Sequence, residues 1–187
     1  TRSTPKIKKD GQMTEQTDKL RQDFIDAMSL CANSVCVVST DGVAGLGGLT
    51  VSAMSSVSAD PDIEADGPTM LICVHANSTS LPVILENGAF CINILGQGSD
   101  KIAEIFAGRH GFTGAARFDG VAYAPLATGA PVFSDALAAF DCSILKSDTI
   151  GTHHVIFGVV RAVTLSDQTD PLIYHKRRFR ALAPETK

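Results

Sequence analysis

The segment from residue 45 to residue 58 has the composition best suited to binding a flat ligand rich in carbonyl groups. Glycines are dense at its start, and hydroxyl side chains follow at Thr50, Ser52, Ser55, Ser56 and Ser58. Glycine lets the backbone approach a planar ring or a phosphate, and hydroxyl groups with exposed backbone N–H groups can donate hydrogen bonds to it. In one continuous strand, Ser52, Ser56 and Ser58 would share a face. A turn followed by a strand with one polar face is the equally simple alternative.

A second candidate segment is His75-Ala-Asn-Ser-Thr-Ser80, which lies between an apolar strand and the start of a helix. A helix N-terminus presents unpaired N–H groups and a partial positive charge, and Asn77, Ser78 and Ser80 add side-chain donors. This combination predicts a phosphate site that needs no lysine. The alternative is that Ser80 only caps the helix.

Two further positions could carry chemistry. Arg109 follows Phe106-Ala-Gly at the end of an expected helix, where it could reach an anionic ligand or simply complement the helix dipole. His153 and His154 follow Gly151-Thr, and adjacent residues of a strand point to opposite faces, so at most one of them faces a given pocket. A single histidine in a strand is more often structural than catalytic.

Several other chemistries are disfavoured by the motifs that the sequence lacks. It has no Gly-x-Ser-x-Gly elbow of a hydrolase, no His-Glu-x-x-His or carboxylate cluster for a metal, and no Walker loop. Thr50 stands where a Rossmann fingerprint would need its third glycine. The five cysteines form no Cys-x-x-Cys pair, and four of them lie in apolar runs. We therefore expect no metal site and no disulfide framework, but small core residues in a reducing cytoplasm.

Charge and hydropathy limit the class of partner. The net charge is -4, and the first twelve residues are basic, so the remainder is more negative than the whole chain. This balance argues against a nucleic-acid partner. No apolar run approaches the about 20 residues of a membrane span, and no signal-peptide pattern is visible. We interpret residues 1–12 as an appended or disordered arm, with Met13 as a plausible native start, and residues 13–187 as one cytoplasmic domain.

The expected elements are many strands and few helices. Leu20, Phe24, Ala27, Met28 and Cys31 recur at helical spacing, and short helices are expected at 81–86, capped by Ser80, and from Ser99 to Gly108. Strands are expected at 34–40, 68–75, 89–95, 137–145 and 153–165, with a hairpin turn at 148–151 and further apolar runs at 171–174 and 179–182. Because strands and helices do not alternate regularly, this order predicts an antiparallel barrel with helices added at its ends.

Seven motifs in order resemble the short-chain flavin reductase family, which includes the reductase components of two-component flavin monooxygenases. The resemblance runs from about Asp23 to Leu182. Its motifs are Phe24-x-x-Ala27-Met28, Gly48-Leu-Thr-Val-Ser-Ala53 with Ser56-Val-Ser58, Ala76-Asn-Ser-Thr-Ser80, Phe90-Cys-Ile-Asn-Ile-Leu95, Phe106-Ala-Gly108, Gly151-Thr-His153 and Pro171-Leu-Ile-Tyr174. One departure is the loop after Asp60-Pro61, which is longer and more acidic than the turn associated with the family.

The resemblance implies a mainly β, split-barrel, FMN-binding type of fold, usually a homodimer with each flavin near the interface. It implies that the isoalloxazine ring and ribityl chain lie along Thr50, Val51, Ser52, Ala53, Ser56, Val57 and Ser58. Cys73 and Val74 would flank the ring, Asn77, Ser78 and Ser80 would hold phosphate, and Phe106, Ala107, Gly108 and Arg109 would pack beside the flavin tail. His153, as the candidate catalytic residue, and Tyr174 would position nicotinamide.

The implied activity is hydride transfer from NADH or NADPH to bound FMN or FAD, and then to a second acceptor such as a partner monooxygenase. FMN and FAD stay open, and NADH is preferred because no cluster of arginines stands ready for a 2′-phosphate. One alternative is a reductase with retained flavin that acts on another acceptor, such as a cobalt corrin. Another is a non-catalytic split barrel that binds flavin or haem.

Overall fold

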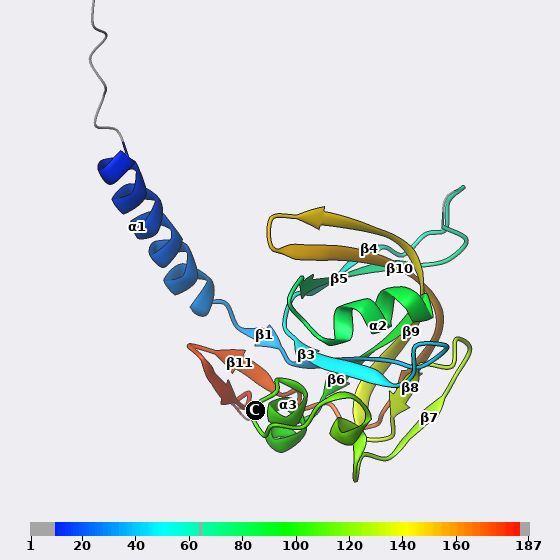
Figure 1. Ribbon diagram of the computed structural model, residues 1–187. Coiled ribbons are helices and arrows are strands. Elements are labelled where there is room, and N and C mark those ends of the chain that lie inside the picture. The colour runs from blue at the N-terminus through cyan, green and yellow to red at the C-terminus, as the bar shows by residue number, and fades with distance from the viewer. Residues whose placement is uncertain (1–9, 64, 184–187) are drawn as a thin grey trace, which may run out of the picture.

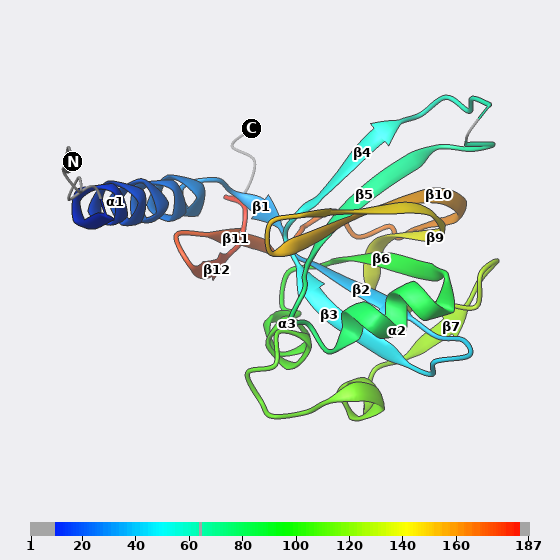
Figure 2. The same cartoon turned by 45° about the horizontal axis from the view of Figure 1, so that its top comes forward.

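The computed structural model describes residues 10–63 and 65–183. The arm predicted for residues 1–12 therefore falls mostly outside the described residues, and helix α1 (Asp10–Ser29) begins within it. Figures 1 and 2 show α1 projecting away from the body of the molecule, as a helix without a covering layer. No described helix combines the length and the apolar character needed to span a membrane.

A curved antiparallel sheet of seven strands forms the body. Its spatial order is β3 (Gly47–Val51), β2 (Cys36–Thr40), β6 (Ala89–Leu95), β9 (Ala136–Ile150), β10 (His153–Leu165), β5 (Thr69–His75) and β4 (Met54–Ser58). The two edge strands, β3 and β4, are consecutive in the chain, and only Ser52 and Ala53 separate them. The sheet is therefore closed by the covalent chain but not by a hydrogen-bonded ladder, which makes it a split barrel. In Figure 2 the β4–β5 arm diverges from the β2–β3 layer at this opening.

Smaller elements surround the barrel. Helices α2 (Ser80–Asn87) and α3 (Asp100–Phe106) both contact β3, as does the 3-10 helix η1 (Gly114–Phe118). A three-stranded sheet has the order β1 (Asn33–Ser34), β11 (Ile173–His175) and β12 (Arg178–Arg180), and β7 (Tyr123–Pro125) pairs with β8 (Pro131–Phe133). The mainly β architecture with added helices is thus confirmed.

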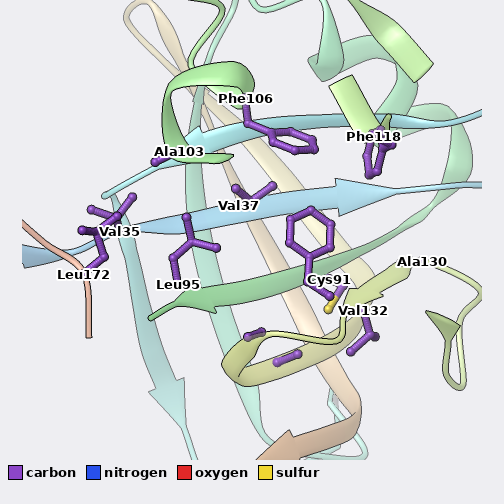
Figure 3. Close-up of a cluster of buried hydrophobic side chains, with 13 residues drawn as sticks. Val35, Val37, Cys91, Leu95, Ala103, Phe106, Phe118, Ala130, Val132 and Leu172 are labelled. Atoms are coloured by element: carbon purple, nitrogen blue, oxygen red, sulfur yellow. The ribbon is translucent and has the colours of Figure 1, made fainter. Parts of the chain in front are cut away.

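The central strands are buried on both faces, which explains their continuous apolar sequences. Alternation along β2 sends Val37 into one core cluster and Val38 into the other, and β6 divides Cys91 and Ile92 in the same way. Figure 3 shows the first cluster, where the rings of Phe106 and Phe118 approach each other. Their centroids are 4.9 Å apart in an edge-to-face arrangement.

One buried amide joins the strands of this core. The side chain of Asn93, fully buried on β6, donates hydrogen bonds to Val37 O at 3.2 Å, Ser39 Oγ at 2.9 Å and Pro131 O at 3.3 Å. Its Oδ1 accepts from the backbone N–H of Phe133 at 2.7 Å. Four satisfied bonds explain how a polar residue can sit within the apolar run of β6.

Several local expectations are corrected. Ser80 is not the cap of α2: Thr79 occupies that position, and Ser80 is the first helical residue. The hairpin turn is at Gly151 and Thr152 rather than 148–151, because β9 continues to Ile150. Ser52, Ser56 and Ser58 do not share one strand face, since the chain changes sheet edge at Ser52 and β4 is irregular between Ser56 and Ser58.

The cysteines mostly behave as predicted. Cys36, Cys91 and Cys142 are buried and free, Cys73 is half-buried, and Cys31 is exposed. Burial raises the pKa of the Cys36 thiol to about 12. Burial, followed by the nearby charge of Asp141, raises the pKa of the Cys142 thiol to about 12. These thiols stay protonated and unreactive at neutral pH.

Candidate functional site at the barrel opening

The carbonyl of Gly48 in β3 receives two side-chain hydrogen bonds. This oxygen accepts a hydrogen bond from Ser80 Oγ at 2.8 Å and another from Arg117 Nη1 at 2.8 Å. A Cβ at Gly48 would lie 2.9 Å from Cε1 of Phe106 and 3.0 Å from Val38 O. The absence of a side chain here lets β3 pack directly on α3, and it sets the position of Thr50, Val51 and Ser52 further along the chain.

Those residues open onto a cavity of about 180 Å³ between the end of β3, helix α3 and the β11–β12 hairpin. The cavity is lined by Val35, Thr50, Val51, Ser52, Ala103, Ala107, Arg109, Tyr174 and Phe179. Its lining is largely apolar, with hydroxyl groups on one side and a guanidinium group on another. Such a lining suits a flat aromatic ligand with a few polar atoms at its edge.

Two aromatic residues of the β11–β12 hairpin form one wall of this cavity. Tyr174 and Phe179 are cross-strand partners with ring centroids 5.5 Å apart. The guanidinium carbon of Arg109 lies 5.9 Å from the centroid of Phe179, and Arg109 Nη1 also pairs with Glu104 at 3.3 Å. The cation is therefore held at the mouth of the cavity by a ring and a carboxylate together.

A pair of histidines lies at the far end of β5 and the start of β10. His153 is the register partner of His75, and their rings meet edge to face with centroids 4.9 Å apart. Nδ1 of His153 is 3.1 Å from Thr152 Oγ1, and Nδ1 of His75 accepts from the backbone N–H of Asn77 at 3.0 Å. Both rings are exposed and both are held by a neighbouring polar group.

The two adjacent histidines face opposite ways, as strand geometry requires. His154 lies 3.3 Å from Ser147 Oγ and 3.5 Å from Thr149 Oγ1, whereas His153 shares its face with His75 and, two residues along β5, with Cys73. Of the two, only His153 can act together with the His75 segment.

The structure brings six of the predicted site residues together in one cavity: Thr50, Val51, Ser52, Ala107, Arg109 and Tyr174. The hydroxyl of Thr50 donates to Ala103 O at 2.7 Å, so it ties β3 to α3. Ala53 follows at the edge change, where its carbonyl accepts from the N–H of Cys73 at 3.0 Å. The backbone of Cys73 is thereby joined to the end of this segment.

Other predicted residues are placed elsewhere. Ser56, Val57 and Ser58 line a separate, apolar cavity of about 320 Å³ together with Pro68, Met70 and Phe140. The side chains of Val74 and Phe106 are buried in the core, so they support the site without lining it. Gly108, with φ of 78°, follows the end of α3.

The phosphate segment is only partly available. The Ser80 hydroxyl is buried and committed to Gly48 O, whereas Asn77 is exposed and Ser78 half-buried. Ser78 Oγ accepts from the N–H of Ser80 at 3.3 Å, so Ser78, one residue before the cap position at Thr79, supplies the side-chain hydrogen bond that the sequence assigned to Ser80. Asn77 and Ser78 are the donors of this segment that a ligand can reach.

Sequence reasoning missed Ala103, Phe179 and Arg117. Phe179 lay in a recognised apolar run, and its alternation with arginines was the available signal. Ala103 is an unremarkable helix residue, and Arg117 reaches Gly48 across 69 positions, a contact that no local pattern indicates. Among the described residues, no group of three or more histidines, cysteines or carboxylates is placed to hold a metal ion.

A split antiparallel barrel with an apolar, hydroxyl-edged cavity at its opening defines the class of flavin reductase split barrels. The family model described as the flavin reductase like domain matches residues 28–183, and the chain belongs to that family.

Named relatives agree with this assignment. The chain is 39% identical over 159 residues to "FMN reductase (NADH) RutF 1" of Methylorubrum extorquens, covering 85% of this chain and 75% of the relative. Among solved structures, it is similar to BorF, the flavin reductase component of a bacterial two-component tryptophan halogenase (TM-score 0.78, 29% identity, 88% and 99% of the two chains). It is also similar to the Streptomyces globisporus NADH:FAD oxidoreductase SgcE6 in complex with NAD and FAD fragments (TM-score 0.78, 26% identity, 90% and 96%).

Proposed function

We propose that this protein is an NADH:flavin oxidoreductase that supplies reduced flavin to a partner monooxygenase. The observation that carries the proposal is the cavity shared by β3, α3 and the β11–β12 hairpin, which collects six of the residues that the sequence and its family resemblance predict for the site. The names of the relatives support FMN and NADH, and the neighbour with NAD and FAD fragments keeps FAD open.

The residues present fit a flavin. β3 is an edge strand, so one row of its backbone N–H and C=O groups is free of the ladder and available to the polar edge of a ring. Tyr174 and Phe179 offer an aromatic wall, and Arg109 offers a cation at the cavity mouth. Bound flavin supplies the acceptor for a hydride from reduced nicotinamide, so no protein nucleophile is needed.

The protein's own contribution is position and electrostatics. Backbone donors of Thr50 to Ser52 stabilise negative charge at the ring edge, and Asn77 and Ser78 hold the flavin phosphate. We place nicotinamide at His153, whose ring is oriented by Thr152 and by stacking on His75. Holding the two rings within about 3.5 Å is the main catalytic demand on the site.

The test compares His153→Ala with His154→Ala, which removes the same ring from the opposite face. Anaerobic stopped-flow with NADH should show slower flavin reduction in the His153 variant. Its flavin dissociation constant should stay unchanged, and the His154 variant should resemble the wild type. Equal reduction rates in all three proteins would remove His153 from the site. Failure of the wild type to bleach bound flavin with NADH would refute the proposed function itself.

We also propose that the protein is a cytoplasmic homodimer in which α1 packs on a second copy. Leu20, Phe24 and Met28 of α1 are 70%, 63% and 48% exposed and lie at helical spacing on one side. Most of the stability of a helix in a protein comes from packing of its apolar face, so an exposed apolar stripe of this kind favours a partner surface. Sedimentation of the wild type and of Leu20→Lys/Phe24→Lys tests this directly, since the substituted helix should yield monomers.

A further inference from the structure

The β11–β12 hairpin concentrates positive charge in an otherwise acidic protein. Lys176, Arg177, Arg178 and Arg180 lie within five residues, whereas the whole chain has a net charge of -4. All four side chains are exposed. The charge therefore forms a local feature of the surface, close to the wall of the cavity.

The turn of this hairpin is conformationally costly. Lys176 and Arg177 have φ values of 48° and 60°, and among the described residues they are the non-glycine residues with positive φ. Two-residue turns of this type are normally occupied by asparagine and glycine. Strained backbone is often found at ligand-binding positions, where a side chain rather than the turn itself is needed.

The turn of the hairpin is also tied to the C-terminal end of α1. The N–H of Lys176 donates to Ser29 O at 2.8 Å, and Arg177 Nη2 pairs with Asp26 at 3.0 Å. One of the four cations, Arg177, is thus paired with a carboxylate. Within the described part of the chain, Lys176, Arg178 and Arg180 form no ion pair with a carboxylate.

Two of these cations flank the aromatic wall of the cavity. Phe179 lines the cavity, and Arg178 and Arg180 are its immediate neighbours in β12, which is the free edge of its sheet. Adjacent residues of a strand point to opposite faces, so both arginine side chains start on the face opposite the ring of Phe179. Long side chains on an edge strand can reach around that edge.

We propose that this hairpin binds the adenosine diphosphate moiety of a dinucleotide, NADH or FAD, whose redox-active ring is bound at the candidate functional site. The inference rests on the proposed function and extends it to the remote half of the ligand. A pyrophosphate is dianionic, and guanidinium groups bind phosphate oxygens through paired, charge-assisted hydrogen bonds. The turn and β12 together carry three arginines.

The moiety can come from NADH or from FAD, and the assay separates the two sources. In Arg178→Ser/Arg180→Ser, we expect the KM for NADH to rise about tenfold if NADH is the source, with the dissociation constants of FMN and FAD unchanged. Reduced nicotinamide mononucleotide, which lacks the adenylate, should then be used equally by both proteins. If FAD is the source, FAD binding weakens about tenfold while FMN binding does not.

A measurement without turnover keeps this inference separate from the proposed function. Isothermal titration with ADP should show binding to the wild type that weakens in the double variant and as ionic strength rises. The matched control is Lys19→Ser/Arg21→Ser, which removes two exposed cations from α1 and should leave ADP binding unchanged. Absence of ADP binding to the wild type, or equal binding to the wild type and the Arg178/Arg180 variant, would overturn the proposal even if flavin reduction is fully active.

Discussion

Gly48→Ala is the smallest change that tests how the site is positioned. The new methyl group would lie 2.9 Å from Cε1 of Phe106 and 3.0 Å from Val38 O, whereas ordinary contacts of this kind begin at 3.4 Å. The ring of Phe106 is buried against Phe118 and Phe133, at centroid distances of 4.9 and 5.5 Å, so it has little room to retreat. The carbonyl of Val38 belongs to the adjacent strand β2 and is equally fixed.

Relief therefore requires β3 to move by several tenths of an ångström, and overpacking of this kind costs about 1–3 kcal/mol in stability. With a urea dependence of about 2 kcal/mol/M for a domain of this size, the midpoint of unfolding should fall by about 0.5–1.5 M. Because β3 leads directly into Thr50 to Ser52, flavin affinity should fall as well.

The assay is urea unfolding followed by flavin titration of the same proteins. Gly47→Ala is the matched control: its methyl group would meet the side chain of Val83 at 3.1 Å, which is only half-buried and can shift. Adding Phe106→Leu to Gly48→Ala should recover part of the affinity, because the obstructing ring is removed. A Gly48→Ala protein with wild-type stability and flavin affinity would refute the view that this close approach positions the site.

Three further results are expected. Asn93→Ala should lower the free energy of unfolding by about 2–3 kcal/mol, because it strands the buried N–H of Phe133 and removes a donor from three acceptors, of which Pro131 O keeps its bond from Ser39 Oγ. A loss below about 1 kcal/mol would mean that water replaces the amide. Thr50→Val should cost only about 0.5–1.5 kcal/mol by urea unfolding, since Ala103 O keeps its bond from the N–H of Ala107, and a larger loss would indicate another role for the hydroxyl. Burial raises the pKa of the Cys36 thiol from 9.0 to about 12, so the stability contributed by the protonated thiol is complete below pH 9 and is lost as the pH rises towards 12. Cys36→Ala should therefore flatten the decline of the unfolding free energy at alkaline pH. An unchanged decline in this variant would contradict the reasoning.

The class of fold was predictable because it depends on short-range patterns. The continuous apolar run at 68–75 indicated a buried strand, and 89–95 was a further strand candidate; β5 and β6 form in these ranges. Thr50 to Ser52, from the glycine and hydroxyl segment, line a cavity, and their part in binding stays a prediction. These features follow from side-chain type and spacing within a few residues.

The sequence-based predictions that were wrong concern residues where long-range contacts override local preference. Ser80 has the residue type of a cap, but Gly48 O lies 32 positions away and captures its hydroxyl. The serines of 52–58 match one strand in spacing, yet the barrel opens between Ser52 and Met54 and divides them between two edges. The hydrogen bonds of Asn93 and Arg117 could not be predicted either, because their partners are brought close by the topology of the fold and not by the neighbouring sequence.

The opening between β3 and β4 has a consequence for how this protein can diverge. A closed barrel pairs every strand on both sides, whereas this one keeps two unpaired backbone edges joined by two residues. Backbone donors on such an edge are the same whatever side chains surround them. A ring can thus be held while the residues around it change, and the surrounding loops and hairpins are free to adapt to a different acceptor.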